Sequence, residues 1–409
     1  MSTTFEPGAP AAQGTIPLSV PHVAGNEWKY IKDCLDTGWV SSVGSYVDRF
    51  EGQVADYVGA KYAVAVCNGT AALHIGLLLA GVEPDEEVIL PSLTFIASAN
   101  AVRYTGAWPT FIDVEPDYWQ MDPERLETFL TKDCHMSGGR LTNRHTSRTV
   151  SAIMPVHILG HPVDLTPIRM IAAKFGLQVV EDAAEALGAK YYDAFVGNTE
   201  SIACFSFNGN KLITTGGGGM VVTNDESLAK RAKYLTTQAK DDPLEFIHGE
   251  VGYNYRLTNI QAAMGYAQME VLDNYVAKKR EIARIYTEAF RGIPGLYPMQ
   301  EAQYAFSTHW LFTVRVDSRQ FGMGSRELLR WLGLRSIQAR PLWQPMHMSP
   351  AHRLSYAGAC PVTASLHDVC LSLPSSVGLT SDDHQRVINS VLEAAPAREM
   401  VAAGKRHDA

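Results

Sequence analysis

Residues 203–220 read ACFSFNGNKLITTGGGGM, two apolar runs separated by a tight polar turn that carries a single lysine, Lys211. The apolar runs predict two buried strands. A lysine held in a turn between such strands is partly desolvated, which favours the neutral amine that attacks an aldehyde. Four glycines follow and permit backbone torsions and close approaches that other residues forbid. This segment indicates an α/β protein with a reactive lysine beside its sheet.

Just upstream of this segment, residues 179–185 (VVEDAAE) form an apolar strand that ends in acidic residues. In open α/β sheets the ligand site lies at the carboxyl ends of the strands, so Asp182 is placed to meet a ligand. A carboxylate there can keep a pyridine nitrogen protonated. Asp182 can instead cap a helix that begins at Ala183, and the motif alone does not decide between the two interpretations.

Residues 64–71 (VAVCNGTA) run from a strand through a small-residue turn into the apolar helix AALHIGLLLAG. The free amides and positive dipole end of a helix N-terminus favour a phosphate, and Thr70 adds a hydroxyl donor. Ordinary helix capping explains the same turn. The glycine spacing fits neither a Walker A loop nor a GxGxxG fingerprint.

The same alternation of strands and helices extends along the chain. Strands are predicted at 63–67, 87–90, 110–114, 150–156 and 177–180, and helices at 71–80, 96–104 and 165–175. Alternation of this kind favours a largely parallel sheet with helices on both faces. From Asn259 to Phe290 the pattern predicts one nearly continuous helix. We therefore expect a flexible end at 1–16, a large domain at 17–257, a small C-terminal domain at 258–393 and a flexible tail at 394–409.

Composition excludes several classes of function. The 409 residues are 46% hydrophobic and 19% charged, as in a globular protein with a large core. The net charge of −8 does not attract nucleic acid. The N-terminus resembles no secretory signal and no window is apolar enough to cross a membrane, so we expect a cytoplasmic protein. The six cysteines form no CxxC pair, which predicts free thiols and no metal site.

One segment, residues 132–148 (KDCHMSGGRLTNRHTSR), stands apart because it is polar and carries Arg140, Arg144 and Arg148 at even spacing. We interpret it first as a solvated insertion. Contact with an anionic substrate is the alternative.

Six motifs, in this order, carry a closer likeness: NGTAALH, PSLTFIASANAV, PVHILGHPVD, EDAAEALGA, FSFNGNKLITTGGGGMVVTND and GYNYRLTNIQAAMG. Together they resemble the DegT/DnrJ/StrS family of sugar aminotransferases from about Pro17 to Pro374. That resemblance implies a pyridoxal 5'-phosphate (PLP) transferase of fold type I, like aspartate aminotransferase. It also implies a mostly parallel seven-stranded sheet in the large domain and a smaller C-terminal α+β domain.

The resemblance assigns residues to the cofactor. Lys211 would carry PLP as a Schiff base, and Asp182 would meet the pyridine nitrogen. Phe95 would stack on the ring, and Asn254 would reach the phosphate of a neighbouring subunit's cofactor, which implies a homodimer with shared sites. The phosphate would be held by Thr70, Ala71 and Ser206.

The chain also departs from the family. Glu185 stands where relatives have His or Gln, so it could meet the phenolic oxygen of PLP only through a shared proton. The loop at 216–219 reads GGGG where GEGG is commoner. Contacts with substrate are predicted for Arg256, His309, Arg340 and His347, although ion pairing and packing explain these four equally well.

The implied reaction passes an amino group from L-glutamate through pyridoxamine 5'-phosphate to C4 of a nucleotide-linked 4-keto-6-deoxy sugar, in bacterial cell-surface glycan or amino-sugar biosynthesis. Likeness to legionaminic acid pathway enzymes favours a UDP-2-acetamido-2,6-dideoxy-4-keto-hexose, and GDP-4-keto-6-deoxymannose, the perosamine synthase substrate, is the alternative. The family's dehydratases have histidine in place of Lys211. A NAD-dependent Rossmann enzyme needs a fingerprint that NGTAALH lacks. A PLP-binding regulator without turnover and a structural protein without cofactor are the non-enzymatic alternatives.

Overall fold

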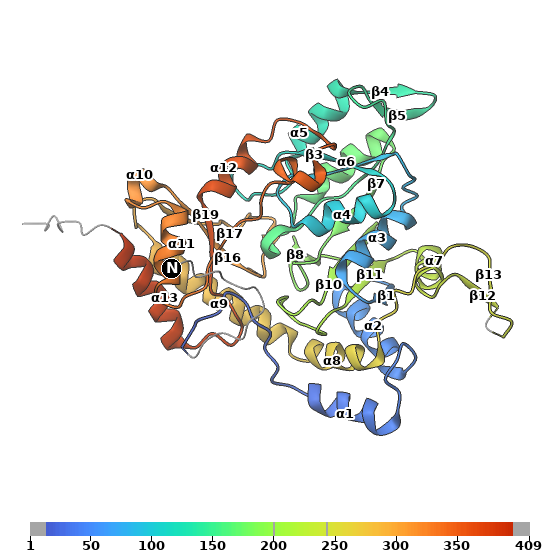
Figure 1. Ribbon diagram of the computed structural model, residues 1–409, viewed down its shortest axis with the longest axis horizontal. Coiled ribbons are helices and arrows are strands. Elements are labelled where there is room, and N and C mark those ends of the chain that lie inside the picture. The colour runs from blue at the N-terminus through green and yellow to red at the C-terminus, as the bar shows by residue number, and fades with distance from the viewer. Residues whose placement is uncertain (1–13, 199–200, 243, 396–409) are drawn as a thin grey trace, which may run out of the picture.

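A computed structural model describes residues 14–198, 201–242 and 244–395 and shows a large α/β layer beside a smaller C-terminal region (Figure 1). The main sheet has eight strands in the order β1-β11-β10-β7-β6-β2-β3-β18. β11 runs antiparallel to both of its neighbours, and the other pairs are parallel. The strands are β1 (Tyr62–Val66), β11 (Gly219–Thr223), β10 (Ile202–Ser206), β7 (Gln178–Asp182), β6 (Val150–Ile153), β2 (Glu87–Pro91), β3 (Trp108–Ile112) and β18 (Tyr356–Ala357).

The expected mostly parallel sheet is therefore confirmed, with one difference in strand number. Seven strands come from residues 62–223, and the eighth, β18, is a two-residue strand from the C-terminal region that pairs with β3. An edge strand of two residues is too short to show a hydrophobic periodicity, so the sequence does not predict it.

Both faces of the main sheet are covered by helices. Val64 and Val66 of β1 pack into one apolar cluster and Ala65 into the other, as alternating side chains of a strand must. All five residues of β2 and of β11 are buried, which explains their continuous apolar runs. The covering helices are α2 (Ser45–Val58), α3 (Gly69–Leu79), α4 (Ile96–Tyr104), α5 (Pro123–Thr128), α6 (Leu165–Phe175) and α7 (Glu226–Thr236).

The C-terminal region forms a second, antiparallel sheet with its own apolar core around Tyr286 and Phe312. The order is β14-β16-β19-β17. Its strands and helices are β14 (Leu296–Pro298), β16 (Phe312–Val316), β17 (Arg340–Pro341), β19 (Cys370–Leu373), α10 (Ser318–Phe321), α11 (Ser325–Gly333), α12 (Pro361–Val369) and α13 (Ser381–Ala394). The domain boundaries expected from the sequence stay a prediction, because β18 returns from this region to the main sheet.

The nearly continuous helix predicted from Asn259 to Phe290 is two helices, α8 (Asn259–Met269) and α9 (Leu272–Phe290), separated by two residues. Val271 leaves helical geometry with φ −118° and ψ 6°. The Glu270 carboxylate at this corner accepts hydrogen bonds from Asn26 and Tyr30, which ties it to α1 (Glu27–Thr37). The interruption therefore lies beside a tertiary contact, which the hydrophobic periodicity does not show.

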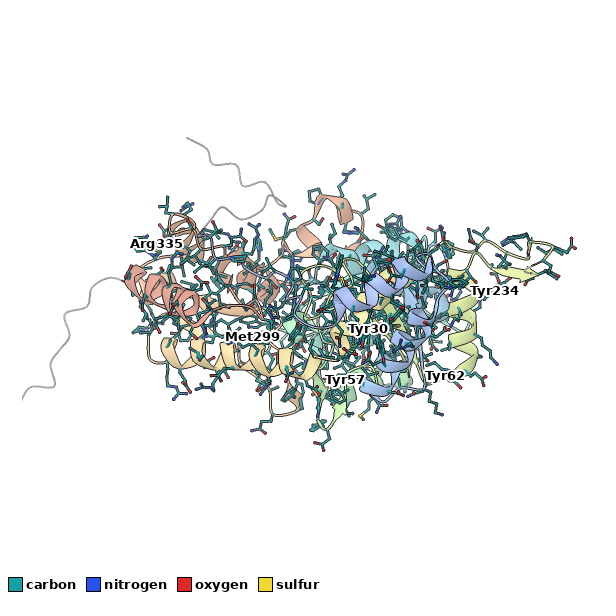
Figure 2. All side chains as sticks on the ribbon, turned by 90° about the horizontal axis from the view of Figure 1, so that it is seen from below. Tyr30, Tyr57, Tyr62, Tyr234, Met299 and Arg335 are labelled. Carbon is teal, nitrogen blue, oxygen red and sulfur yellow. The ribbon has the colours of Figure 1, made fainter. Side chains whose placement is uncertain are left out.

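Short strands form three smaller sheets. Two are hairpins that project from the body of the molecule (Figure 1), and Figure 2 shows one of them, β12–β13, reaching beyond Tyr234. The strands are β4 (Cys134–Ser137), β5 (Arg140–Asn143), β8 (Lys190–Tyr191), β9 (Ala194–Phe195), β12 (Lys240–Asp242), β13 (Ile247–His248) and β15 (Ala305–Phe306).

The polar segment 132–148 is the β4–β5 hairpin with its flanking turns. Arg140 forms an ion pair with Glu86 just before β2. The Arg148 guanidinium lies 3.9 Å from Glu87 and 4.3 Å from the centre of the Trp108 ring. These partners stand at the amino ends of β2 and β3, opposite the carboxyl ends where α/β sheets bind ligands. The hairpin is thus anchored away from that edge, which favours the insertion over the substrate contact.

Most of the two ends predicted to be flexible, residues 1–13 and 396–409, lies outside the described residues. Ile16, which falls within the end predicted to be flexible, is buried, and its backbone pairs with Ile337. None of the helices in the described ranges is long and apolar enough to cross a lipid bilayer.

Candidate active site

A cavity of about 280 Å³ opens at the carboxyl ends of β7 and β10. This size is close to the lower end of small-molecule sites. Six predicted site residues line it together: Thr70, Phe95, Asp182, Glu185, Ser206 and Lys211. They come from four separate segments of the chain, and the sheet brings them to one point.

One end of the cavity is the N-terminus of α3. Asn68 caps this helix by accepting the Ala71 N–H at 2.8 Å, so the capping interpretation of the turn is correct for that amide. Thr70 and Ser206 line the cavity, whereas Ala71 does not. A Cβ added to Gly69 would lie 2.6 Å from the Ser206 Cβ, so only glycine allows β10 and α3 to approach this closely. The helix end and two hydroxyls form a cradle suited to a phosphate.

Asp182 ends β7 and is buried. Its Oδ2 accepts a 2.6 Å hydrogen bond from the Ser98 hydroxyl, and its Oδ1 accepts the Ala184 N–H at 3.1 Å. Burial raises the pKa of this carboxyl, and the bond from Ser98 opposes the increase. Each carboxylate oxygen has a second acceptor position, so Asp182 can still bind a donor in the cavity.

Glu185 and Lys211 face each other across the cavity floor. The Lys211 Nζ lies 3.4 Å from Glu185 Oε1, and Glu185 Oε2 accepts the Leu159 N–H at 2.7 Å. Burial raises the pKa of Glu185, and the positive charge of Lys211 partly offsets this. The glutamate is thus held by the backbone on one side and presented to the lysine on the other.

Aromatic rings close the cavity. The Trp310 ring centre lies 4.0 Å from the Lys211 Nζ. Trp310 stacks on Trp343 with 6.3 Å between ring centres and 6° between planes, and Trp343 contacts Phe95 edge to face. Phe95 is 50% exposed, so its ring is available to a planar ligand.

Comparison with known proteins agrees with this geometry. The family model described as the DegT/DnrJ/EryC1/StrS aminotransferase family matches residues 21–392. The chain belongs to this family. GDP-perosamine synthase of Escherichia coli O157:H7 is 38% identical over 92% of this chain and 98% of that protein. GDP-perosamine synthase of Caulobacter vibrioides is 39% identical over 91% and 96%, respectively.

Solved structures place the fold in the same family. DesV of S. venezuelae superimposes with a TM-score of 0.82 at 32% identity, covering 91% of this chain and 95% of that one. The predicted family, fold class and PLP-dependent aminotransferase activity are thereby confirmed.

The cavity of this family member fits PLP by its donor set. The cradle of Gly69, Thr70 and Ser206 suits the phosphate, a buried carboxylate suits the pyridine nitrogen, and an amine suits the aldehyde. No group of three or more His, Cys, Asp or Glu within the described ranges is arranged to hold a metal ion.

None of Asn254, Arg256, His309, Arg340 and His347 lines this cavity, and the contacts predicted for them stay predictions. Arg340 lies in β17 opposite Ser372, and His347 Nδ1 is 2.6 Å from the Ser92 hydroxyl. His309 borders a separate, wider hollow of about 820 Å³ beside α9, where burial lowers its pKa to about 4.

Asn254 and Arg256 lie where the chain leaves the β12–β13 hairpin. Asn254 pairs with Thr237 through the backbone, and Arg256 pairs with Val66. The expectation that Asn254 serves a neighbouring subunit stays a prediction.

Sequence reasoning missed three residues. Ser98 orients Asp182, and Trp310 and Trp343 close the cavity. Trp310 directly follows His309, and Trp343 lies between Arg340 and His347, but the prediction chose those three residues because charged or titratable groups suit a charged substrate. The only signal for Ser98 was a small polar residue one turn after Thr94, to which it is hydrogen-bonded at 2.7 Å.

Proposed function

We propose that this protein transfers an amino group from L-glutamate to C4 of a nucleotide-linked 4-keto-6-deoxy sugar, with Lys211 as the reacting amine. The observation that carries this proposal is one cavity in which Lys211, Glu185 and Asp182 meet the N-terminus of α3. The two GDP-perosamine synthases support a GDP-linked sugar, GDP-4-keto-6-deoxymannose, better than the UDP-2-acetamido sugar that we expected first.

PLP, when bound, supplies an electrophilic aldehyde and a ring that accepts electron density from a bond being broken. We assign its phosphate to the cradle at α3, where the helix dipole and the hydroxyls of Thr70 and Ser206 stabilise negative charge. Phe95 then lies where an aromatic face can hold the ring. These residues would bind and orient the cofactor, which would fix its reacting carbon relative to Lys211.

Lys211 is the proposed proton carrier. Its Nζ lies on the cavity floor within reach of both the amino donor and the sugar, so it can remove a proton at one carbon and return it at another. Asp182, fixed by Ser98 and the Ala184 N–H, stabilises positive charge on the ring nitrogen. Without that positive charge the ring would be a weaker acceptor of electrons.

Glu185 is proposed to hold Lys211 in place and to share a proton with an oxygen of the ring. Its raised pKa supports this assignment, because a carboxyl that is easily protonated can donate as well as accept. A glutamate at this position is the main departure of this chain from its family, and its role stays a prediction.

A homodimer with shared sites is part of the proposal. The β12–β13 hairpin projects from the molecule (Figure 1) and exposes Leu244, Phe246 and Ile247. Exposed apolar side chains on a projecting element suit a partner surface. A mixture of Lys211→Ala and Asn254→Ala proteins, each inactive alone, should then recover about a quarter of the sites by subunit exchange. Full inactivity of the mixture, with exchange verified by mass, would rule out shared sites.

The direct test uses ¹⁵N-labelled glutamate with GDP-4-keto-6-deoxymannose or UDP-2-acetamido-2,6-dideoxy-4-keto-hexose, followed by mass spectrometry. The proposal expects label in the GDP sugar with the wild type and none with Lys211→Ala. The control is Lys174→Ala, which replaces an exposed lysine that pairs with Glu127 and should transfer the label fully. Label only in the UDP sugar would overturn the carrier assignment. Bound cofactor that never responds to glutamate would indicate a regulator without turnover. A cytoplasmic location also stays a prediction.

A further inference from the structure

Trp310 joins the C-terminal region to the loop that carries Lys211. Its indole N–H donates a 2.7 Å hydrogen bond to the carbonyl oxygen of Asn210, which belongs to the peptide bond leading into Lys211. Its ring lies against the Lys211 Nζ, and the side chain is 3% exposed. One tryptophan thus contacts both the backbone and the amino group of the proposed reacting lysine.

Lys279 of α9 binds the backbone of Trp310. The Lys279 Nζ donates a 2.7 Å hydrogen bond to the Trp310 carbonyl oxygen, and the Ser375 hydroxyl approaches the same oxygen at 3.5 Å. His309, immediately before Trp310, has a φ of 48°, a left-handed conformation that is unfavourable for a residue with a Cβ. The chain therefore turns sharply here to direct the indole toward the cavity.

The position of Lys279 is energetically unfavourable for an amine. Lys279 is 2% exposed, and burial lowers its pKa to about 7. Within the described residues, Lys279 forms no ion pair with a carboxylate. Methionine has nearly the same length and would avoid the desolvation of the amine, so packing alone does not explain the lysine. What the amine provides and methionine lacks is the bond to Trp310, which either protonation state can donate.

We propose that Trp310 is a positioning residue of the active site, which fixes the Lys211 loop through its N–H and limits the directions of the Lys211 Nζ through its ring, with Lys279 holding Trp310 in place. This inference rests on the proposed function of Lys211. It assigns a role to a buried lysine and a tryptophan outside the set that binds PLP.

The test compares Lys279→Met, Trp310→Phe and Trp310→Ala with the wild type. Tyr286→Phe is the matched control, because Tyr286 lies on the same helix, is fully buried and donates a 2.9 Å bond to a backbone carbonyl oxygen that belongs to Pro374 and not to Trp310 or the Lys211 loop. Two readouts are used: the rate at which glutamate converts the bound cofactor as a function of glutamate concentration, and hydrogen–deuterium exchange of residues 207–215 in the cofactor-free protein.

The proposal expects a fall of about tenfold in the limiting rate for Lys279→Met and Trp310→Phe and about a hundredfold for Trp310→Ala, because misplacing a reacting group costs rate. The half-saturating glutamate concentration should change by less than about twofold, since the binding of donor is not altered. Exchange of residues 207–215 should be faster in all three variants.

Tyr286→Phe should lower the melting temperature and leave both readouts unchanged. If Lys279→Met and Trp310→Phe behave like this control, the positioning role is wrong. Should Lys279→Met fail to fold, Trp310→Phe, which keeps most of the ring, decides the question alone. A wild type that ignores glutamate overturns the proposed function, and the exchange data still test the contact between Trp310 and the Lys211 loop.

Discussion

Replacing Ser98 by alanine tests how a hydrogen bond opposes the rise that burial causes in the pKa of Asp182. The hydroxyl donates a 2.6 Å hydrogen bond to Asp182 Oδ2, and both side chains are buried, so water does not replace the lost donor. A hydrogen bond to a charged group contributes about 2 kcal/mol, which corresponds to about thirtyfold in an equilibrium constant. The pKa of Asp182, already raised by burial, should rise further.

We therefore expect Ser98→Ala to weaken PLP binding by about thirtyfold, because a neutral Asp182 stabilises a protonated ring nitrogen less well. The loss of PLP affinity should also depend on pH. Raising the pH restores the carboxylate, so the defect should be greatest at acidic pH and shrink as pH increases. The assay is titration of cofactor-free protein with PLP, followed by tryptophan fluorescence across a pH series.

Ser325→Ala is the control for this prediction. Ser325 is equally buried and donates a 2.6 Å bond to the Asp368 carbonyl oxygen in the C-terminal region. Its loss should reduce thermal stability without changing PLP affinity. Equal PLP affinities for Ser98→Ala and the wild type at every pH would refute the reasoning about Asp182.

Three further predictions concern the cradle, the acid stability and the hairpin. Gly69→Ala should abolish PLP binding measured by fluorescence, because the new methyl group would lie 2.6 Å from the Ser206 Cβ. Binding like that of the wild type would mean that the helix end is not the phosphate site. Burial lowers the pKa of His161 to about 4, and its Nε2 accepts the Ala302 N–H, so the unfolded chain binds the extra proton and stability should fall as pH decreases from about 6.5 to 4. His161→Gln, which can accept the same N–H without titrating, should flatten that decline in melting temperature, and an unchanged slope would assign it to other groups. Arg140→Ala should leave aminotransfer kinetics unchanged within about twofold, because its ion pair lies at the amino ends of the strands, and a large rise in KM for the sugar would restore the substrate-contact interpretation.

The sheet and much of the cavity were predictable because their signals are local. The apolar runs of β2 and β11 follow from burial on both faces, Asp182 is the last residue of β7, and Lys211 lies in the turn that follows β10. The carboxyl ends of strands in one sheet meet at one edge, so these residues had to be neighbours.

What the sequence could not supply depends on contacts between distant segments. The break at Val271 lies beside the hydrogen bonds that join Glu270 to α1 and its N-cap, and Trp310 from the C-terminal region closes the cavity. Arg340 pairs with Ser372 in the second sheet and His347 is bonded to Ser92, and the substrate contacts predicted for both stay predictions. Residue type indicates what a side chain can do, and only the packing decides where it lies.

Chemical trapping of the cofactor tests the central claim most directly. The protein is loaded with PLP, reduced with borohydride, digested and analysed by mass spectrometry, with and without prior addition of excess glutamate. The account predicts that PLP is attached to the peptide containing Lys211, and that glutamate given before the reductant removes this attachment. Attachment to another lysine, or attachment to Lys211 that glutamate leaves unchanged, would contradict it.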